Sequence, residues 1–223
     1  PLIGYSINRV FQDITRETKE HLTDLQEIYL PSQHAQLISI IRNGLYARNR
    51  EKKDYINHIT GDIHYIGYFL HSSKTIITVH DIMYYYYLKG LKQCIWKWLY
   101  IKSLQKAAKI IFISEHSRNE VLKIIHLPIE KTAVIPNPIS KDYIFTPKQL
   151  NLSKPIILHI GTLERKNLKR TIYALSPINC HLRIIGKIDK DIKDLLLENN
   201  IDYSNVSDLS NHDIIKEYIQ CDF

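Results

Sequence analysis

The 223-residue sequence predicts an α/β fold of two units, each built around a parallel sheet. Short apolar runs alternate with helical patterns along the whole chain. Two of these runs, KTIITV at 74–79 and KIIFI at 109–113, are almost continuously β-branched and apolar, which is typical of strands covered on both faces. The alternation stops at Pro136-Asn137-Pro138 and then restarts, which indicates a second unit.

The first unit is expected at 1–138, where strands and helices follow one another. The candidate strands are Leu2–Ser6, Glu27–Leu30, Asp54–Ile59, Lys74–His80, Lys109–Ser114 and Thr132–Ile135. The helical patterns cover 8–25, 34–47, 62–70, 88–107 and 115–126. This alternation favours a doubly wound, Rossmann-like sheet.

A connector is expected at 139–154 and a second Rossmann-like unit at 155–223. That unit reads as strands at 156–160, 182–185 and, more weakly, 203–206, with helices at 166–175, 189–199 and 211–220. The chain stops where another strand would begin, which would leave an uncovered sheet edge. The sequence therefore predicts a second unit that is incomplete.

Composition and charge argue against several classes of protein. Hydrophobic residues make up 44% of the chain and charged residues 24%, a globular rather than a disordered composition. The net charge of +7 is spread along the chain without an RNA- or DNA-binding module, so no nucleic-acid partner is expected. There is no apolar run of roughly 20 residues for a spanning helix, no signal-peptide pattern and no paired cysteine spacing. We expect a cytoplasmic protein.

The clearest chemical signal is IGTLERKN at 160–167, between a strand and a helix. Its glycine lets a ligand approach the backbone, and the helix N-terminus offers free N–H groups and a positive dipole end. Arg165 and Lys166 add cations where the dipole disfavours them unless an anion is bound. The segment is either a phosphate or diphosphate site at the carboxyl edge of a sheet or a solvated turn with two surface cations. A second turn, at Gly186-Lys187, follows the next strand and favours the phosphate site.

Several segments together resemble the family 4 glycosyltransferases, which have the two-domain GT-B fold. ILHIGTLERKNLKRTIYAL at 157–175 is similar to the nucleotide-binding loop of that family. The other matching segments, in chain order, are SINRVFQDI at 6–14, NHITGDIHYIGYFL at 57–70, TVHDI at 78–82, FISEHSRNEVLKII at 112–125, VIPNPIS at 134–140, LRIIGK at 182–187 and IKEYIQCDF at 215–223. The resemblance covers essentially the whole chain and implies a GT-B type fold whose second domain is incomplete.

The resemblance implies a donor site in the second unit. Lys166 falls on the lysine of the GT(x)₃KN pattern, which contacts the donor diphosphate in the family, and Gly161 falls on the glycine of that turn. Arg165 is the neighbour of that lysine. Gly186 and Lys187 complete the expected diphosphate-binding set.

The resemblance also implies a catalytic pair in the first unit. His80 falls on the histidine of the family's HD turn, which lies near the transferred sugar, and Asp81 accompanies it. His58 and Asp62 are candidate acceptor or cleft contacts. A metal pair of His58 and His64 is an alternative without an obvious third ligand. Asp62 is also expected as a helix N-cap, and His64 as a structural residue.

The activity implied is transfer of a mannose- or glucose-like hexose from a nucleotide-diphosphate sugar to a glycan or lipid-linked acceptor, with retention. The family commonly uses no metal, and no cofactor is expected beyond the nucleotide sugar as co-substrate. The family's EGFGLP-type donor segment does not occur, so this chain alone is expected to transfer sugar slowly or not at all. The alternatives are a truncated, non-catalytic binding or scaffold protein and a nucleotide-binding domain of another chemistry.

Two further motifs have competing interpretations. Asp189-Lys190-Asp191 has the DxD spacing of metal-dependent transferases, but it opens a predicted helix, where acids cap free amides. The segment 88–106 combines Trp96 and Trp98 with five lysines. It is compatible with peripheral contact to an anionic membrane, at the inner face of the cell membrane, and with an ordinary helix that packs its apolar face on the sheet. We favour the helix cap and the packed helix.

Overall fold

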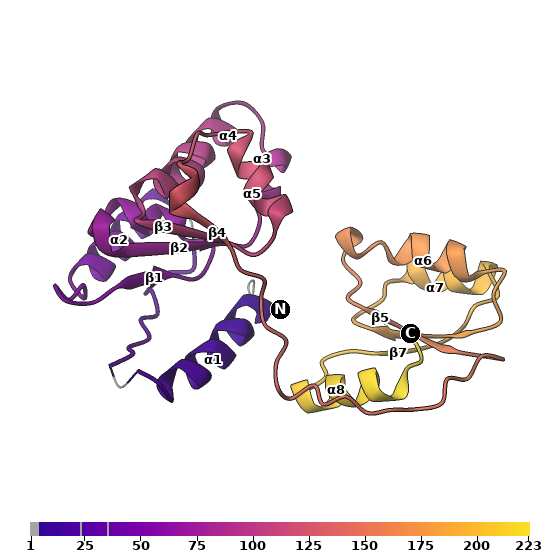
Figure 1. Ribbon diagram of the computed structural model, residues 1–223. Helices are drawn as coiled ribbons and strands as arrows, with labels where there is room; N and C mark the ends of the chain where they lie inside the picture. Colours follow the sequence, from indigo (N-terminus) through magenta and orange to yellow (C-terminus); the bar gives the residue numbers. More distant parts are fainter. Residues whose placement is uncertain (1–4, 23, 35) are drawn as a thin grey trace. The chain divides into compact units, whose positions relative to one another are not determined.

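The computed structural model describes residues 5–22, 24–34 and 36–223. The chain divides into two compact units, with the boundary in the sequence between Ser140 and Lys141 (Figure 1). Each unit is an α/β structure with one parallel sheet, which confirms the predicted fold class. Within the described residues, every helix is too short or too polar to cross a membrane.

The first unit holds a four-stranded parallel sheet in the order β1-β2-β3-β4. The strands are β1 (Asn57–Ile59), β2 (Thr75–Val79), β3 (Lys109–Phe112) and β4 (Thr132–Val134). The register aligns Ile59, Ile77 and Ile110 in one row across three strands. Ile77 and Ile110 are fully buried, so the β-branched runs that predicted these strands also form the core of the sheet.

The described residues of the first unit also form five α-helices and several short turns, of which α1 and α2 precede β1 and the others lie between the strands. The helices are α1 (Tyr5–Lys19), α2 (Leu37–Arg48), α3 (Met83–Tyr87), α4 (Gly90–Trp96) and α5 (Glu115–Leu122). The turns are η1 (His64–Tyr68), η2 (Ser72–Lys74), η4 (Lys102–Lys106) and η5 (Ile129–Lys131), all of 3-10 type, and η3 (Lys97–Ile101), which is a π-helical turn. The helix predicted at 62–70 is therefore reduced to the η1 turn.

The N-terminal strand prediction, Leu2–Ser6, is not supported. Its residues 2–4 lie outside the described residues, and Tyr5 and Ser6 form the beginning of α1. The half-buried side chains of Ile7, Val10 and Ile14 recur at helical spacing, which gives this segment one apolar face as a helix.

The strand predicted at Glu27–Leu30 is wrong. The segment is irregular and pairs with no strand in the described part of the first unit. Tyr29 is 68% exposed, and only Leu30 packs against the core. Local β-propensity alone does not make a strand, because a strand needs a neighbour to satisfy its backbone groups.

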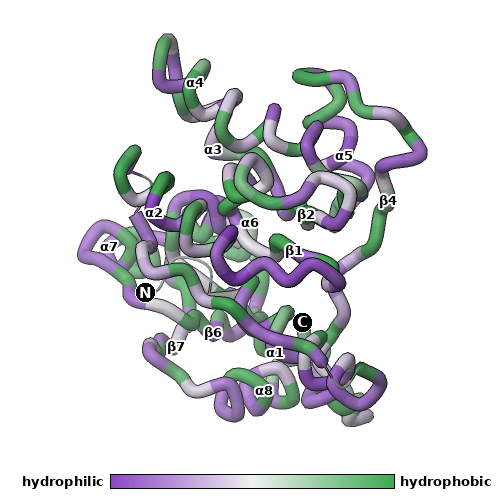
Figure 2. The backbone as a smooth tube through the Cα atoms, turned by 90° about the vertical axis from the view of Figure 1, so that its left-hand side faces the viewer, coloured by the Kyte–Doolittle hydropathy of each residue, from purple (hydrophilic) through white to green (hydrophobic). Residues whose placement is uncertain are grey.

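The predicted helix 88–107 is broken into three pieces. Gly90, at φ +58°, is the first residue of α4, and the helix then changes to the π-turn η3 and the 3-10 turn η4. Ile101 and Leu104 are fully buried, as the favoured interpretation requires. Leu91, by contrast, is 76% exposed, and α4 has no buried residue, so its apolar face does not pack on the sheet. Figure 2 shows α4 at the outer margin of the first unit.

The second unit holds three parallel strands in the order β5-β6-β7. Its elements are β5 (Ile156–Ile160), η6 (Glu164–Lys166), α6 (Leu168–Leu175), β6 (His181–Ile185), α7 (Lys190–Glu198), β7 (Asp202–Val206) and α8 (Asn211–Gln220). Helices α6 and α7 cover one face of the sheet and α8 covers the other (Figure 1). Ile172, Leu182 and Leu196 are fully buried between α6, α7 and the sheet. The segment 143–155 that precedes β5 has no helix or strand.

The chain returns after α8 to the free edge of β5. Leu158 donates its N–H to the carbonyl of Phe223 at 2.8 Å, and Phe223 donates to the carbonyl of Ile156 at 3.2 Å. In a parallel strand pair, one residue donates to and accepts from two residues of the neighbouring strand that lie two positions apart, and Phe223 bonds to Ile156 and Leu158 in this way. The winding direction therefore reverses at β5, with β6 and β7 on one side and Phe223 on the other. In open α/β sheets, ligands bind outside the carboxyl ends of the strands at such a reversal.

Candidate functional site

The carboxyl end of β5 leads into a crowded glycine turn. Gly161 has φ +90° and donates its N–H to the carbonyl of Ile185 at 2.8 Å. A Cβ at this position would lie 3.1 Å from Cγ of Lys166. Glycine is needed here for its backbone conformation and because the Lys166 stem crosses it. The sequence thus places a lysine directly over the end of β5.

The turn after β6 lies against the first one, as expected for neighbouring parallel strands. Gly186 has φ +134° and donates its N–H to the carbonyl of Val206 at 2.8 Å. Thr162, in the first turn, donates its hydroxyl to the carbonyl of Lys187 at 2.6 Å. One side-chain hydrogen bond therefore joins the two turns into a single surface.

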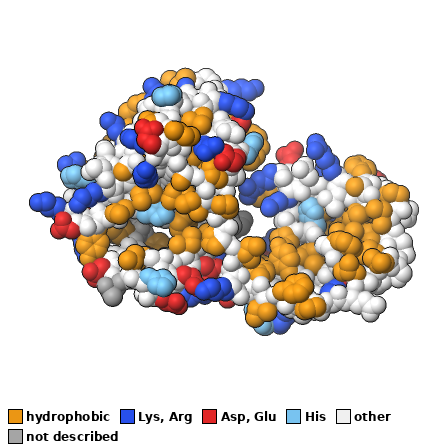
Figure 3. Space-filling model, in the orientation of Figure 1, with side chains coloured by type: hydrophobic (Ala, Val, Ile, Leu, Met, Phe, Trp, Pro, Cys, Tyr) orange, Lys and Arg blue, Asp and Glu red, His pale blue; other side chains and the backbone are white. Residues whose placement is uncertain are grey.

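Four cations gather at the start of α6. Helix α6 follows Asn167, which has φ +59° and provides no side-chain cap, and its first turn contains no acid. The basic side chains are Arg165, Lys166, Lys169 and Arg170, all exposed. Figure 3 shows Lys and Arg side chains together over the β5–α6 connection. None of the four has an ion-pair partner among the described residues. Free N–H groups and unpaired cations make this edge attractive to an anion.

Lys187 is less available than these four cations. Its ammonium lies 3.5 Å from Oδ2 of Asp208, and both side chains are largely exposed. The carboxylate partly offsets the charge of Lys187. Ser207 and then Lys187 hold the pKa of Asp208 below its ordinary value. Of the five residues expected at the donor site, Gly161 and Gly186 shape the two turns, Arg165 and Lys166 are exposed cations beside them, and Lys187 is partly paired. Their role in donor binding stays a prediction.

His159 is a residue of this edge that the sequence analysis missed. It lies two positions before Gly161, its Nδ1 is 3.4 Å from the hydroxyl of Thr171, and its Nε2 is buried without a hydrogen-bond partner among the residues that the structure describes. Desolvation lowers the pKa of His159; a backbone hydrogen bond to Gly161 opposes this, and the charge of Lys166 adds to the lowering. The available signal was one polar residue inside the apolar run IILHI.

At the first sheet, His80 follows the carboxyl end of β2. It is 6% exposed, its Nε2 lies 2.9 Å from the carbonyl of Thr60, and its own carbonyl accepts a hydrogen bond from Ser117. Asp81 is exposed, and its Oδ1 accepts the N–H of Met83 at 3.0 Å. His80 is thus fixed at the sheet edge, while Asp81 holds the beginning of α3.

Phe11 of α1 brings two of the candidate histidines together. Its ring stands edge-on to His58 at 5.7 Å and to His80 at 5.9 Å between ring centroids. Nε2 of His58 lies 2.8 Å from the hydroxyl of Thr78, and desolvation lowers the pKa of His58. The segment SINRVFQDI contained this phenylalanine, but its periodicity did not show which side chains it would cover.

Asp62 and His64 do not join this cluster. Asp62 is exposed and caps no helix, because the following turn begins after Ile63 as a 3-10 turn, so its predicted N-cap role is wrong. His64 is 2% exposed, and its Nδ1 donates to the carbonyl of Tyr100 at 3.1 Å. Burial lowers the pKa of His64. The structural interpretation of His64 is confirmed.

The DxD motif is a helix cap. Oδ1 of Asp189 accepts the N–H of Ile192 at 2.9 Å at the beginning of α7, as the favoured interpretation predicts. Across the described ranges, no three or more His, Cys, Asp or Glu side chains are grouped so as to hold a metal ion.

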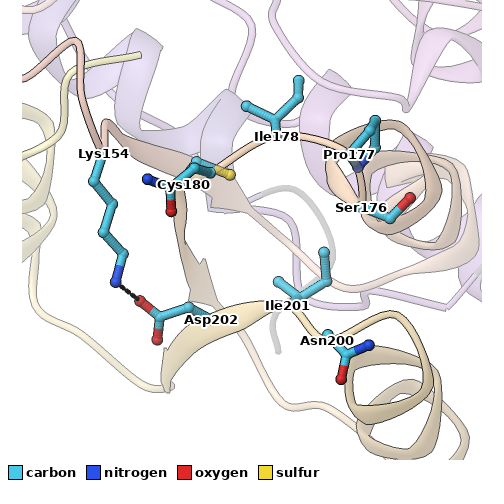
Figure 4. Close-up of a pocket in the computed structure, with 9 residues that line it drawn as sticks. Lys154, Ser176, Pro177, Ile178, Cys180, Asn200, Ile201 and Asp202 are labelled. Atoms are coloured by element: carbon cyan, nitrogen blue, oxygen red, sulfur yellow. Dashed lines mark ion pairs between the residues drawn. The ribbon is translucent and has the colours of Figure 1, made fainter.

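A shallow cavity of about 240 Å³ lies at the opposite, amino edge of the second sheet (Figure 4). Its charged side chains neutralise each other, because Nζ of Lys154 lies 2.8 Å from Oδ2 of Asp202. Cys180 also lines it, and burial raises the pKa of that thiol. We therefore place the candidate site at the carboxyl edge and not in this cavity.

Comparison with known proteins identifies the family of this chain. The model of the family described as Glycosyltransferase Family 4 matches residues 15–143, more than half of the chain. O-antigen chain mannosyltransferase B of Escherichia coli is 29% identical over 152 residues, which cover 60% of this chain and 38% of that protein. The crystal structure of TarM is similar with a TM-score of 0.44 and 13% identity, over 66% of this chain and 30% of that chain. By the family match, this chain belongs to glycosyltransferase family 4.

Proposed function

We propose that this chain binds a nucleotide-diphosphate sugar at the carboxyl edge of its second sheet and serves hexose transfer to a glycan or lipid-linked acceptor. Mannose is the first donor sugar to test, because a relative is called a mannosyltransferase. The chain spans less than half of that relative's length. The proposal therefore concerns the reaction of the whole protein and the part of it carried here.

The observation that carries the proposal is the position of Lys166. Its stem crosses Gly161 at the end of β5, next to the point where the winding of the sheet reverses. In the proposed reaction, Lys166, Arg165 and the free N–H groups of α6 stabilise the negative charge that develops on the departing nucleoside diphosphate. Such preorganised charges act most strongly on a leaving group. They would take the place of a metal ion in a metal-independent, retaining transfer.

His80 and His58 are the residues of the first unit that we assign to sugar binding. With Nε2 of His80 directed at the carbonyl of Thr60, that ring presents Nδ1 as its second polar atom. Desolvation lowers the pKa of His58 and so favours its neutral form near pH 7. We assign these two rings to hydrogen bonds with sugar hydroxyl groups, and Asp81 to the positioning of α3.

The test is calorimetric titration of the 223-residue chain with GDP and UDP. Lys166→Ala is expected to weaken nucleoside diphosphate binding about tenfold, the loss of one charge-assisted contact. Lys216→Ala is the matched control, because Lys216 lies on α8, on the other face of the sheet, and pairs with Asp213. Undetectable binding, or equal affinity of the wild type and the Lys166 variant, would remove the proposed site.

A further inference from the structure

The first unit exposes an apolar surface along α3, α4 and η3, which we call the aromatic surface. Its residues are Met83, Tyr84, Tyr87, Leu91, Ile95 and Trp98, with exposed fractions from 48% at Met83 to 76% at Leu91. Figure 3 shows hydrophobic side chains over this part of the unit, with Lys and Arg and also some Asp or Glu side chains beside them. Exposed apolar residues gathered along neighbouring elements mark an interaction site more often than scattered ones do.

The exposure follows from how the segment is anchored. The ring of Trp96 stacks on that of Tyr100, with 4.8 Å between the ring centroids, and its centroid lies 6.1 Å from that of Tyr85. Tyr100 is only 7% exposed. This inner stack fixes one side of α4 to the unit. Leu91 and Ile95 recur at helical spacing on the outer side. The apolar face is thus directed outwards by a packed inner face, and it is not a loosely attached helix.

The charge around the aromatic surface is mainly positive. The stretch 82–114 contains no Asp or Glu but six lysines, of which Lys89, Lys92 and Lys102 are exposed next to the apolar residues. The neighbouring acids on α5 are already paired, Glu115 with Arg118 and Glu120 with Lys123. Glu120 also accepts the hydroxyl of Tyr86. Asp81, which directly precedes this stretch, is exposed, and its carboxylate accepts the N–H of Met83. The charge next to the apolar residues is therefore mainly positive.

Helix α2 has the same composition. Its exposed residues include Leu37, Ile38, Ile41 and Leu45, between 46% and 80% exposed. The stretch 28–50 has three arginines and no acid. Helix α2 packs on η1, and η1 in turn packs on η3 and η4, so both apolar faces belong to one layer of the first unit.

We propose that the aromatic surface, together with the exposed face of α2, docks the first unit on an anionic lipid membrane. Tyr and Trp side chains favour the membrane interface, and lysines around an apolar face add attraction to anionic headgroups. A protein partner would have to offer an acidic rim around an apolar centre, whereas an anionic lipid surface supplies both at once. The proposal goes beyond the proposed function and does not depend on nucleotide binding.

Docking would also place the catalytic edge near the lipid. Helix α3 begins at Met83, three positions after His80, and Asp81 holds that beginning through its bond to the Met83 N–H. The membrane surface would thus lie next to the carboxyl edge of β2.

The experiment is co-sedimentation of the full chain with vesicles of phosphatidylcholine alone and of phosphatidylcholine with about one third phosphatidylglycerol. We expect binding to the anionic vesicles and at least a fivefold weaker partition to the neutral ones, with loss of binding at about 0.5 M salt, where charges are screened. The double variant Lys89→Glu/Lys92→Glu and the variant Trp98→Ser should each lower the partition at least fivefold. The control is Lys190→Glu/Lys193→Glu on α7 of the second unit.

Three results would overturn the proposal. They are failure to bind anionic vesicles, equal binding by the wild type and the surface variants, and a dimer in light scattering that both surface variants abolish. The last result would identify the surface as a contact between copies of this chain. Circular dichroism of each variant verifies its fold, and the GDP titration reports the nucleotide site separately, so that one proposal can fail while the other stands.

Discussion

Gly186 leaves the space that the side chain of Thr162 occupies. A Cβ at position 186 would lie 2.9 Å from Cγ2 of Thr162 and 3.1 Å from its hydroxyl oxygen. The same hydroxyl donates to the carbonyl of Lys187 at 2.6 Å. The two turns of the candidate site are therefore held together by a contact that only glycine permits.

Gly186→Ala should destabilise the second unit by about 2 kcal/mol. The substitution places a Cβ at φ +134° and forces Thr162 to move, and each effect costs on the order of 1 kcal/mol or more. Urea unfolding measures the change. Gly61→Ala is the control, because a Cβ there meets nothing within 4 Å. Equal stability of the two variants would mean that the turns are not packed as described.

Asp189→Ala should destabilise α7 by about 1 kcal/mol, whereas Asp189→Asn should change stability little. The physical reason is that the side-chain oxygen accepts the Ile192 N–H, and an asparagine oxygen can do the same. Thermal unfolding with and without Mn²⁺ measures both variants. If the asparagine variant were as damaged as the alanine variant, and if Mn²⁺ stabilised only the wild type, Asp189 would be a metal ligand instead.

The strands of both sheets could be predicted because β-branched runs such as 74–79 and 109–113 satisfy local preference and burial at once. The segment Glu27–Leu30 has the same local preference but no neighbouring strand, and pairing partners cannot be read from a single segment. The exposure of Leu91 could not be predicted from the sequence for a related reason. Apolar residues at helical spacing usually indicate a buried face, and only the stack of Trp96 on Tyr100 shows which side of α4 is turned inwards.

The candidate site was predictable only where its residues are close in sequence. Gly161 and Lys166 lie five positions apart in one turn, so the motif indicated their contact. Phe11 and His80 lie far apart in the chain and meet only through the packing of α1 on the sheet edge. The missing signal for such contacts is tertiary, since a single helical segment does not specify which strand it covers.

Stability of the first unit should fall as the pH drops from 7 to 5. Burial lowers the pKa of His64 from its ordinary value of 6.5, so the unfolded chain takes up the proton first and is favoured below that pH. Well above pH 6.5 the ring is neutral in both states and its contribution is fully present. His58, whose pKa is also lowered, adds to the same slope.

His64→Asn should reduce this slope by one proton, up to about 1.4 kcal/mol per pH unit. The asparagine amide can replace the Nδ1–H bond to the Tyr100 carbonyl without titrating. Urea unfolding at pH 5, 6 and 7 measures the slope, with the exposed His126→Asn as control. An unchanged slope in the His64 variant would show that this ring accepts its proton equally well in the folded state.

Asp222→Ala should weaken the pairing of Phe223 with β5 at the edge of the second sheet without unfolding the unit. Oδ2 of Asp222 accepts the N–H of Ile156 at 2.8 Å, and its Oδ1 lies 3.1 Å from Nζ of Lys148. The Ile156 bond, followed by Lys148, lowers the pKa of Asp222. These contacts are therefore present at neutral pH and are lost as the pH falls through that lowered pKa. Hydrogen exchange should become faster at the amides of Ile156 and Leu158 in the variant, while β6 stays protected.

The matched control for this edge is Asp194→Ala, an exposed position on α7. It should leave exchange at Leu158 unchanged, because Asp194 takes no part in the strand pair. Faster exchange throughout β5, β6 and β7 in the Asp222 variant would contradict the prediction, since it would mean that the whole unit had lost stability. Unchanged exchange at Leu158 would mean that Phe223 is held beside β5 without help from Asp222, and that the reversal of the sheet at β5 rests on the backbone pairing alone.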